Sequence, residues 1–183
     1  MAATIPSEQR AATADVPPRT VAVPQAVLVG AGAGMAAALV MSMVMLPARW
    51  LGLLGTQPPR RITDRLLDVA GGSEPTPEPA RRVGTALVHL ATGAVCGAVF
   101  GLARVVTHRR FPTAVVGPAY GAGVWTFAYA VAAPTLELLP PPWRDRPARP
   151  QVMLVAHLFF GLVTATLFDR AIESAPSGGT RRS

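Results

Sequence analysis

Residues 89–93 read His-Leu-Ala-Thr-Gly, and residues 157–161 read His-Leu-Phe-Phe-Gly. The same series of motifs precedes each of these two stretches. The first series consists of Gly30-x3-Gly34, Pro47, Leu51-Gly52-Leu53-Leu54 and Pro58-Pro59-Arg60-Arg61. The second consists of Gly117-x3-Gly121, Pro134, Leu136-Glu137-Leu138-Leu139 and Pro141-Pro142-Trp143-Arg144. A recurring order of this kind predicts a tandem repeat of one two-helix unit.

The apolar residues are gathered into segments that are long enough to cross a bilayer. Half of the 183 residues are hydrophobic and 15% are charged, and a span of about 30 Å of hydrocarbon takes roughly 20 residues. The expected spans are about residues 26–46, 83–106, 113–133 and 151–168. The first is longer than the core of a signal peptide and no small-residue cleavage site follows it, so we expect it to be retained.

The sequence therefore predicts an all-α fold, an integral membrane four-helix bundle. One membrane domain is expected over residues 26–172. Residues 1–25 and 173–183 carry no periodic apolar face, and we expect both tails to be disordered.

A short amphipathic stretch follows the prolines at 58–59. Ile62, Leu66 and Val69 fall on one face of a helix there. The opposite face carries charges at spacings that favour ion pairs within the helix, namely Arg61, Asp64, Arg65 and Asp68. This pattern predicts an interfacial helix lying on the bilayer. Gly71-Gly72 should end it, and residues 71–79 should form a spacer.

The basic residues are distributed in a way that argues against nucleic-acid binding. The net charge is +7 and all 17 basic residues are arginines, scattered over every tail and loop. A nucleic-acid surface would collect them on one face, so we expect membrane lipids as partners and no nucleic acid. Four spans place 8 arginines on the side of the termini and 9 on the other. The dense cluster over 104–110 favours cytoplasmic termini in a bacterial inner membrane.

Rows of small residues predict where the helices touch. Association between helices in lipid depends on close backbone approach and on hydrogen bonds. The glycines spaced by four residues are Gly30, Gly34, Gly93, Gly97, Gly101, Gly117, Gly121 and Gly161. We expect these rows, a glycine zipper, to be the packing faces of the bundle.

Two histidines continue these glycine faces. His89 lies four residues before Gly93, and His157 lies four before Gly161, so both rings should face the bundle interior. Equivalent positions in a two-fold repeat should converge, and ionisable groups inside a membrane usually serve a function. The further residues expected around this site are Trp125, Tyr129, Arg60 and Arg144. The alternative is a neutral imidazole that bridges two helices by a hydrogen bond.

We find no nucleophile motif, phosphate loop, HExxH or CxxC in the sequence. We therefore expect a protein that is not an enzyme and whose His pair binds a small ligand, a proton or an ion. The methionines of the first span are apolar filler, and no metal site is expected. Two alternatives stay open: a haem b held by the two histidines in a redox protein, and a purely structural bundle that binds a copy of itself or another membrane protein.

The order of these motifs resembles that of a known group of proteins. A Gly-rich first helix, a Pro-Pro-Arg turn, two His-x3-Gly helices and a Gly-x3-Gly helix ending at Pro134 are similar to the small YagU-like inner-membrane proteins of bacteria, or to a sister family. The resemblance covers roughly residues 26–170. It implies a multi-pass protein of the bacterial inner membrane and no activity, because the function of those proteins is unknown.

Overall fold

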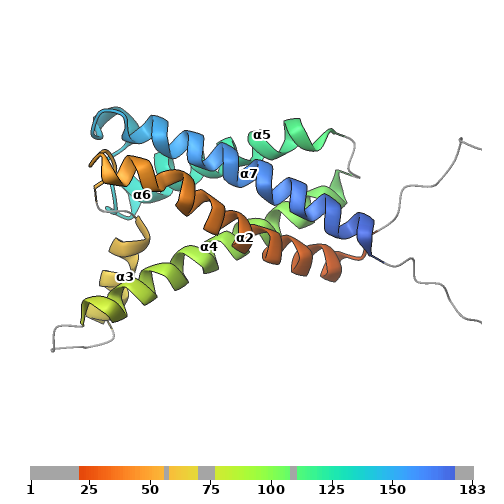
Figure 1. Cartoon of the computed structure of the whole chain (residues 1–183), viewed down its shortest axis with the longest axis horizontal. Helices are drawn as coiled ribbons and strands as arrows, with labels where there is room; N and C mark the ends of the chain where they lie inside the picture. The colour runs from red at the N-terminus through yellow and green to blue at the C-terminus, as the bar shows by residue number, and fades with distance from the viewer. Residues whose placement is uncertain (1–20, 56–57, 70–76, 108–110, 176–183) are drawn as a thin grey trace, which may run out of the picture.

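Four long helical segments run along the long axis of the molecule in the computed structural model (Figure 1). The structure describes residues 21–55, 58–69, 77–107 and 111–175, which contain no strand. The long segments are α2 (Val23–Trp50), α4 (Glu78–Val106), α5 (Thr113–Trp125) with its continuations η1 (Thr126–Ala132) and α6 (Ala133–Thr135), and α7 (Arg149–Ser174). The loops contain α3 (Pro58–Val69) and the 3₁₀ helix η2 (Pro142–Arg144).

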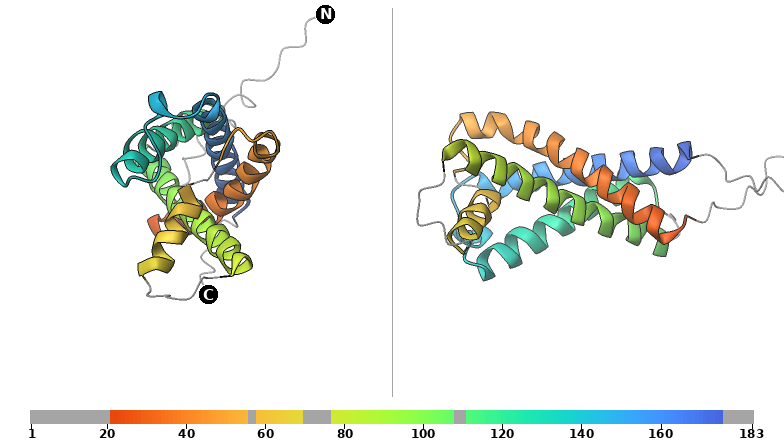
Figure 2. Two further views of the ribbon diagram at one scale, coloured as in Figure 1. Left: turned by 90° about the vertical axis from the view of Figure 1, so that its left-hand side faces the viewer. Right: turned by 90° about the horizontal axis from the view of Figure 1, so that it is seen from below.

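Each long segment is long and apolar enough to cross a membrane, so the chain is a multi-pass membrane protein. Four crossings return the chain to the end at which it started. The first residues of α2 and the last residues of α7 accordingly lie at one end, called here the terminal end (Figure 1). The opposite end, with α3 and η2, is the loop end; Figure 2 (left) shows α3 lying across it.

The helices extend beyond the predicted spans. α2 begins at Val23 and α7 ends at Ser174, so a few residues of each predicted disordered tail are helical. α4 begins at Glu78, within the stretch predicted as a spacer, because Pro79 occupies the first turn of a helix, where its missing N–H costs nothing. Gly71-Gly72, the remaining tail residues 1–20 and 176–183, and the side chains of Asp68 and Val69 lie outside the described part.

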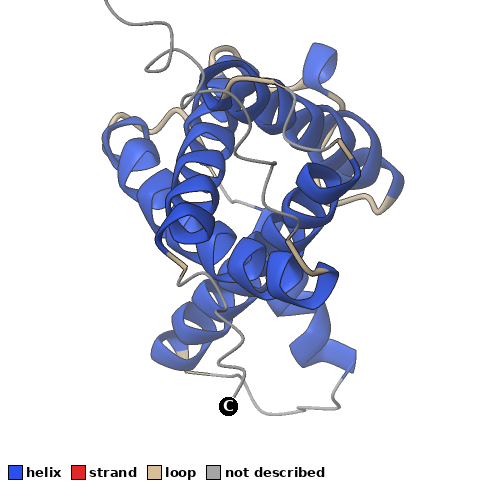
Figure 3. Cartoon of the chain, turned by 90° about the vertical axis from the view of Figure 1, so that its right-hand side faces the viewer, coloured by secondary structure: helices blue, strands red, loops and turns tan. Residues whose placement is uncertain are grey.

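Glycines form the contacts between α2 and α4 and between α5 and α7. α2 lies against α4 and α7, and α5 lies against α7, so the segments surround the axis of the bundle when seen from the terminal end (Figure 3). A Cβ atom added to Gly30 would lie 2.2 Å from the carbonyl oxygen of Gly97, and one added to Gly161 would lie 2.1 Å from that of Gly117. The backbones of both pairs therefore touch, with no space for a side chain.

The remaining glycines of the rows make the same kind of contact. A Cβ at Gly34 would lie 2.1 Å from the carbonyl oxygen of Gly93, and one at Gly101 would lie 2.1 Å from that of Ala26. A Cβ at Gly121 would lie 2.0 Å from the carbonyl oxygen of His157. Through this last contact, the backbone of α7 touches that of α5 at His157.

Two equivalent phenylalanines meet in the terminal half of the bundle. Phe100 and Phe168 each lie eleven residues after the histidine of their helix. Their ring centroids are 5.7 Å apart with the planes at 86°, and each residue is 1% exposed. Tyr120 adds a second edge contact to Phe100, at 5.0 Å. Three aromatic rings therefore join α4, α5 and α7 in this half of the bundle.

The first and the third long segments end in the same way. Gly52 and Glu137 both have positive φ, +71° and +55°, and the N–H of each donates to a carbonyl three residues back, Arg49 and Pro134 respectively, at 3.0 Å. The hydrogen bonds that end the two helices therefore align Arg49 with Pro134. The sequence motifs instead align Pro47 with Pro134, two residues away. The difference arises because Gly52 lies five residues after Pro47, whereas Glu137 lies three after Pro134.

Candidate functional site

The two imidazoles each make one hydrogen bond to a backbone carbonyl. Nε2 of His89, on α4, lies 3.1 Å from the carbonyl oxygen of Ala38 on α2. Nδ1 of His157 lies 2.7 Å from the carbonyl oxygen of Met153, one turn earlier on α7. His157 is buried and His89 is partly buried. No hydrogen bond joins the two rings within the described part of the chain.

These bonds determine where the ring proton lies. A carbonyl oxygen can only accept, so in a neutral ring the bonded nitrogen must carry the hydrogen. The other nitrogen, Nδ1 of His89 and Nε2 of His157, then keeps its lone pair. Neither has a hydrogen-bond partner among the described residues, where no three His, Cys, Asp or Glu side chains gather as a metal site either. Each ring therefore retains one basic atom that can accept a proton or bind a cation.

Trp125 and Tyr129, predicted as walls of this site, lie against each other. Their ring centroids are 5.7 Å apart and the planes are inclined at 60°. The hydroxyl of Tyr129 donates to the carboxylate of Asp145 at the loop end, which directs its polar atom away from the level of the histidines. The indole Nε1 of Trp125 is buried and has no hydrogen-bond partner in the described residues.

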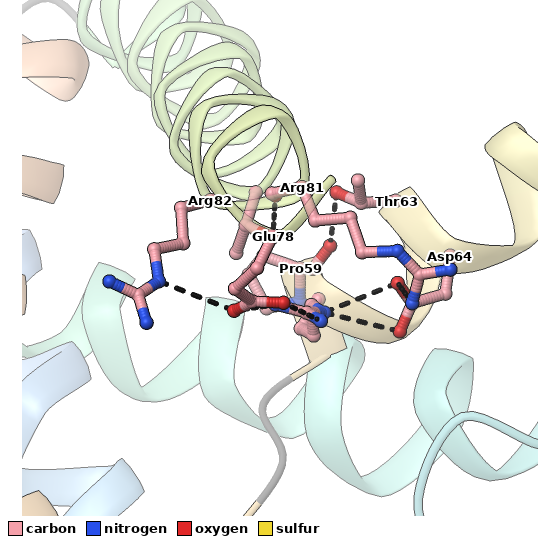
Figure 4. Close-up of polar contacts among 8 residues, drawn as sticks. Pro59, Thr63, Asp64, Glu78, Arg81 and Arg82 are labelled. Atoms are coloured by element: carbon pink, nitrogen blue, oxygen red, sulfur yellow. Dashed lines mark hydrogen bonds and ion pairs between the residues drawn. The ribbon is translucent and has the colours of Figure 1, made fainter. Parts of the chain in front are cut away.

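Arg60 and Arg144, predicted to cap the site, lie in different settings. Arg60 binds Glu78 at the start of α4 with both terminal nitrogens, at 2.8 and 3.0 Å, and reaches Asp64 at 3.2 Å. Arg144 is exposed at the end of η2. The structure thus places Arg60 in an ion-pair network between α3 and α4 and does not link it to an imidazole. Figure 4 shows Asp64 and Glu78, the carboxylates of this network.

The charge pattern of α3 differs from the expectation. Asp64 pairs with Arg60 and with Arg81 of α4, both at 3.2 Å, and not with Arg61. The reason is that α3 packs on α4 through Thr63, whose methyl group would lie 2.9 Å from a Cβ added to Gly84. This contact turns Asp64 toward α4 (Figure 4).

Two arginine–aspartate pairs, one involving α4 and one involving α7, were not predicted. Arg81 and Arg149 each lie eight residues before the histidine of their helix. Arg81 pairs with Asp64, and Arg149 pairs with Asp145 at 3.0 Å. The side chains of Arg149 and Asp145 are 6% and 1% exposed. The matching distance to His89 and His157 is a sequence signal that could have revealed this position.

Asp145 should make the stability of the protein dependent on acid pH. Burial acts to raise the pKa of this carboxyl, but hydrogen bonds from Tyr129 and from the Arg146 amide, together with the charge of Arg149, hold the pKa below its ordinary value of 3.8. Its stabilising contribution is therefore complete above pH 3.8 and is lost as the pH falls through the lowered folded-state pKa.

The measurement is the thermal midpoint of the wild type and of Asp145→Asn in detergent, from neutral pH down to about pH 2. The wild type should lose more stability than the variant over this range. Equal losses would show that other carboxylates account for the acid sensitivity.

A second buried ion pair lies at the terminal end. Arg104 of α4 binds Asp169 of α7 through Nη2 at 2.9 Å, and the side chains are 4% and 8% exposed. Thr113, the first residue of α5, donates to the same carboxylate, and Nη1 of Arg104 donates to the carbonyl of Phe111 at 3.1 Å. Three segments therefore meet at one carboxylate. The sequence interpretation missed it because the predicted fourth span ends at residue 168.

A comparison with protein families gives one result. The family model described as "Family of unknown function (DUF6789)" matches residues 24–177, which include all four spans, both histidines and both buried ion pairs. No curated protein and no solved structure matches the chain.

Proposed function

We propose that this chain, which belongs to the DUF6789 family of unknown function, is a membrane protein that is not an enzyme and that binds a proton, an ion or a small ligand at His89 and His157. The proposal rests on the hydrogen bonds of the two rings. Each ring donates its N–H to a carbonyl and keeps a lone pair inside the bundle. Ionisable groups inside a membrane usually serve a function, and this lone pair can take up a proton or a ligand.

Two observations support a single site formed by both rings. Each imidazole lies four residues before a glycine, Gly93 or Gly161, that contacts the backbone of a neighbouring helix. Other residues at equivalent positions also meet or match, namely Phe100 with Phe168 and Gly52 with Glu137. These matches support our proposal that the chain is a tandem repeat, in which the two histidines are one position present twice.

The test uses variants that keep the structural hydrogen bond and remove the free nitrogen. In His89→Gln the side-chain amide can still donate from the position of Nε2, and in His157→Asn it can still donate from that of Nδ1. The ring nitrogens of the ¹⁵N-histidine-labelled protein are followed by NMR from about pH 8 to about pH 4. We expect both rings to titrate, and replacement of either histidine by its matched variant to shift the titration of the other.

The stability of the variants serves as the control. Both matched variants should unfold close to the wild-type temperature, whereas His89→Ala should be less stable because it removes the hydrogen bond that joins α4 to α2. Two rings that titrate independently, or that do not titrate at all in this range, would contradict the proposal. The histidines would then be helix-bridging residues in a structural bundle.

A haem-binding redox protein is the second candidate, and one observation favours it. Histidines that bind a metal usually donate their other ring N–H to a carbonyl or carboxylate, as both rings do here. A haem protein would purify with a Soret absorption band that is lost in both His89→Gln and His157→Asn. A colourless protein that takes up no added haemin would exclude this candidate.

The same proposal includes the cellular setting. We propose a bacterial inner membrane, cytoplasmic termini and contacts with lipids, with self-association or a membrane-protein partner as a further possibility. The four spans and the arginines near the terminal end support this setting. The order of the glycine, Pro-Pro-Arg and His-x3-Gly motifs supports kinship with the YagU-like proteins.

A further inference from the structure

Two arginines at the loop end converge on Gly55. A Cβ added to Gly55 would lie 2.6 Å from Nη2 of Arg149 and 3.2 Å from Nη1 of Arg146. Both guanidinium groups therefore flank the same point, at a residue that has no side chain and has φ of +58°. Two like charges this close repel each other, more strongly where water is excluded. Their approach needs negative charge nearby.

One carboxylate faces these two cations. Asp145 accepts from Nη1 of Arg149 at 3.0 and 3.1 Å, and it also accepts from the hydroxyl of Tyr129 and from the Arg146 amide. Nε of Arg149 is buried and has no hydrogen-bond partner in the described part of the chain, and the Arg146 guanidinium makes no hydrogen bond there either. The cluster thus has one positive charge and several N–H donors in excess.

Its place in the fold suits an anion from the bilayer. Arg149 opens α7, a helix of 26 residues, and the N-terminus of a helix carries partial positive charge. Trp143, close by in η2, is 75% exposed, and exposed tryptophans beside membrane spans lie at the depth of the lipid headgroups. The excess charge therefore lies where phosphate groups are abundant.

We propose that Arg146 and Arg149 form, at Gly55, a binding site for a phosphate group, that of an anionic phospholipid at the loop end of the bundle. Planar guanidinium groups bind phosphate oxygens through paired hydrogen bonds, and Nη2 of Arg149 and the Arg146 guanidinium, both beside Gly55, are not used by Asp145. The site is independent of the histidines, because it uses neither ring and lies at one end of the spans.

The experiment measures the thermal midpoint of the full chain in neutral detergent, with added phosphatidylglycerol, phosphatidylcholine or inorganic phosphate. Saturating phosphatidylglycerol should raise the midpoint of the wild type by about 5 °C, and phosphatidylcholine should not. The gain should disappear in Arg146→Gln. It should persist in Arg144→Gln, which removes the same charge from the same loop at an exposed position two residues away.

Each outcome bears on the site. A gain produced equally by inorganic phosphate, and lost in Arg146→Gln alone, would support the site and assign it to free phosphate. No gain in the wild type would overturn the proposal, and so would equal losses in Arg144→Gln and Arg146→Gln, because these would indicate a general attraction of basic loops to anionic lipid.

Discussion

Gly30→Ala is expected to destabilise the protein by about 1–3 kcal/mol, as overpacking does in other proteins, whereas Gly32→Ala should leave it unchanged or slightly more stable. The two glycines lie two residues apart on α2 and differ in their surroundings. A Cβ on Gly30 would lie 2.2 Å from a carbonyl oxygen of α4, so that the helices must separate. A Cβ on Gly32 meets nothing within 4 Å, and alanine favours a helix by up to about 1 kcal/mol over glycine.

The measurement is the free energy of unfolding of both variants in mixed micelles, titrated with a denaturing detergent. Because the substitution and the helix are the same, the difference between the variants isolates the contact with Gly97. Equal values for Gly30→Ala and Gly32→Ala would mean that α2 and α4 do not touch there in the folded protein.

The packing faces and the spans were predictable because the signals for both are local. A row of glycines at spacing four lies on one face of any helix, and the length of an apolar segment decides whether it crosses the bilayer. The four spans are confirmed. The glycine rows do not predict which helices pack against each other, because the rows of all four helices look alike. The contact of α2 with α7 has no signature in either helix alone.

The candidate site was predictable to the level of a helix face and no further. His89 lies on the same face of α4 as Gly93, so its ring is directed toward α2. The group that accepts its hydrogen bond is a backbone carbonyl, that of Ala38. Every residue offers such a carbonyl, so only the crossing of the helices selects one. His157 has the same phase and instead bonds within its own helix. Equivalent sequence positions therefore did not imply equivalent hydrogen bonds.

The ion pairs were missed for a related reason. Arg104 is the one charged residue inside a predicted span, while Asp169 falls one residue beyond the predicted end of another, 65 positions away in the chain. Nothing local connects them. A charge inside a span should nevertheless be read together with the charges at the ends of all other spans, since burial in lipid makes a partner nearly obligatory.

Arg104→Met is accordingly expected to cost about 3–5 kcal/mol of stability, the loss typical of a buried pair with one member removed. The carboxylate of Asp169 would remain buried without the positive charge of Arg104, and the Phe111 carbonyl, just before the start of α5, would lose its donor. Arg65→Met is the control. Arg65 lies 4.0 Å from Glu137, and their side chains are 57% and 87% exposed, so its loss should cost no more than about 1 kcal/mol.

A double variant separates the charge from the packing. If the cost of Arg104→Met comes from the carboxylate left behind, then adding Asp169→Asn should restore part of the stability, and the two effects should not add. Unfolding in mixed micelles measures all four proteins. A loss in Arg104→Met as small as that in Arg65→Met would place the cluster in contact with water or headgroups. Such a result would mean that the terminal end of α4 and α7 lies outside the hydrocarbon, because removing the charge of Arg104 from beside a carboxylate within it would cost more.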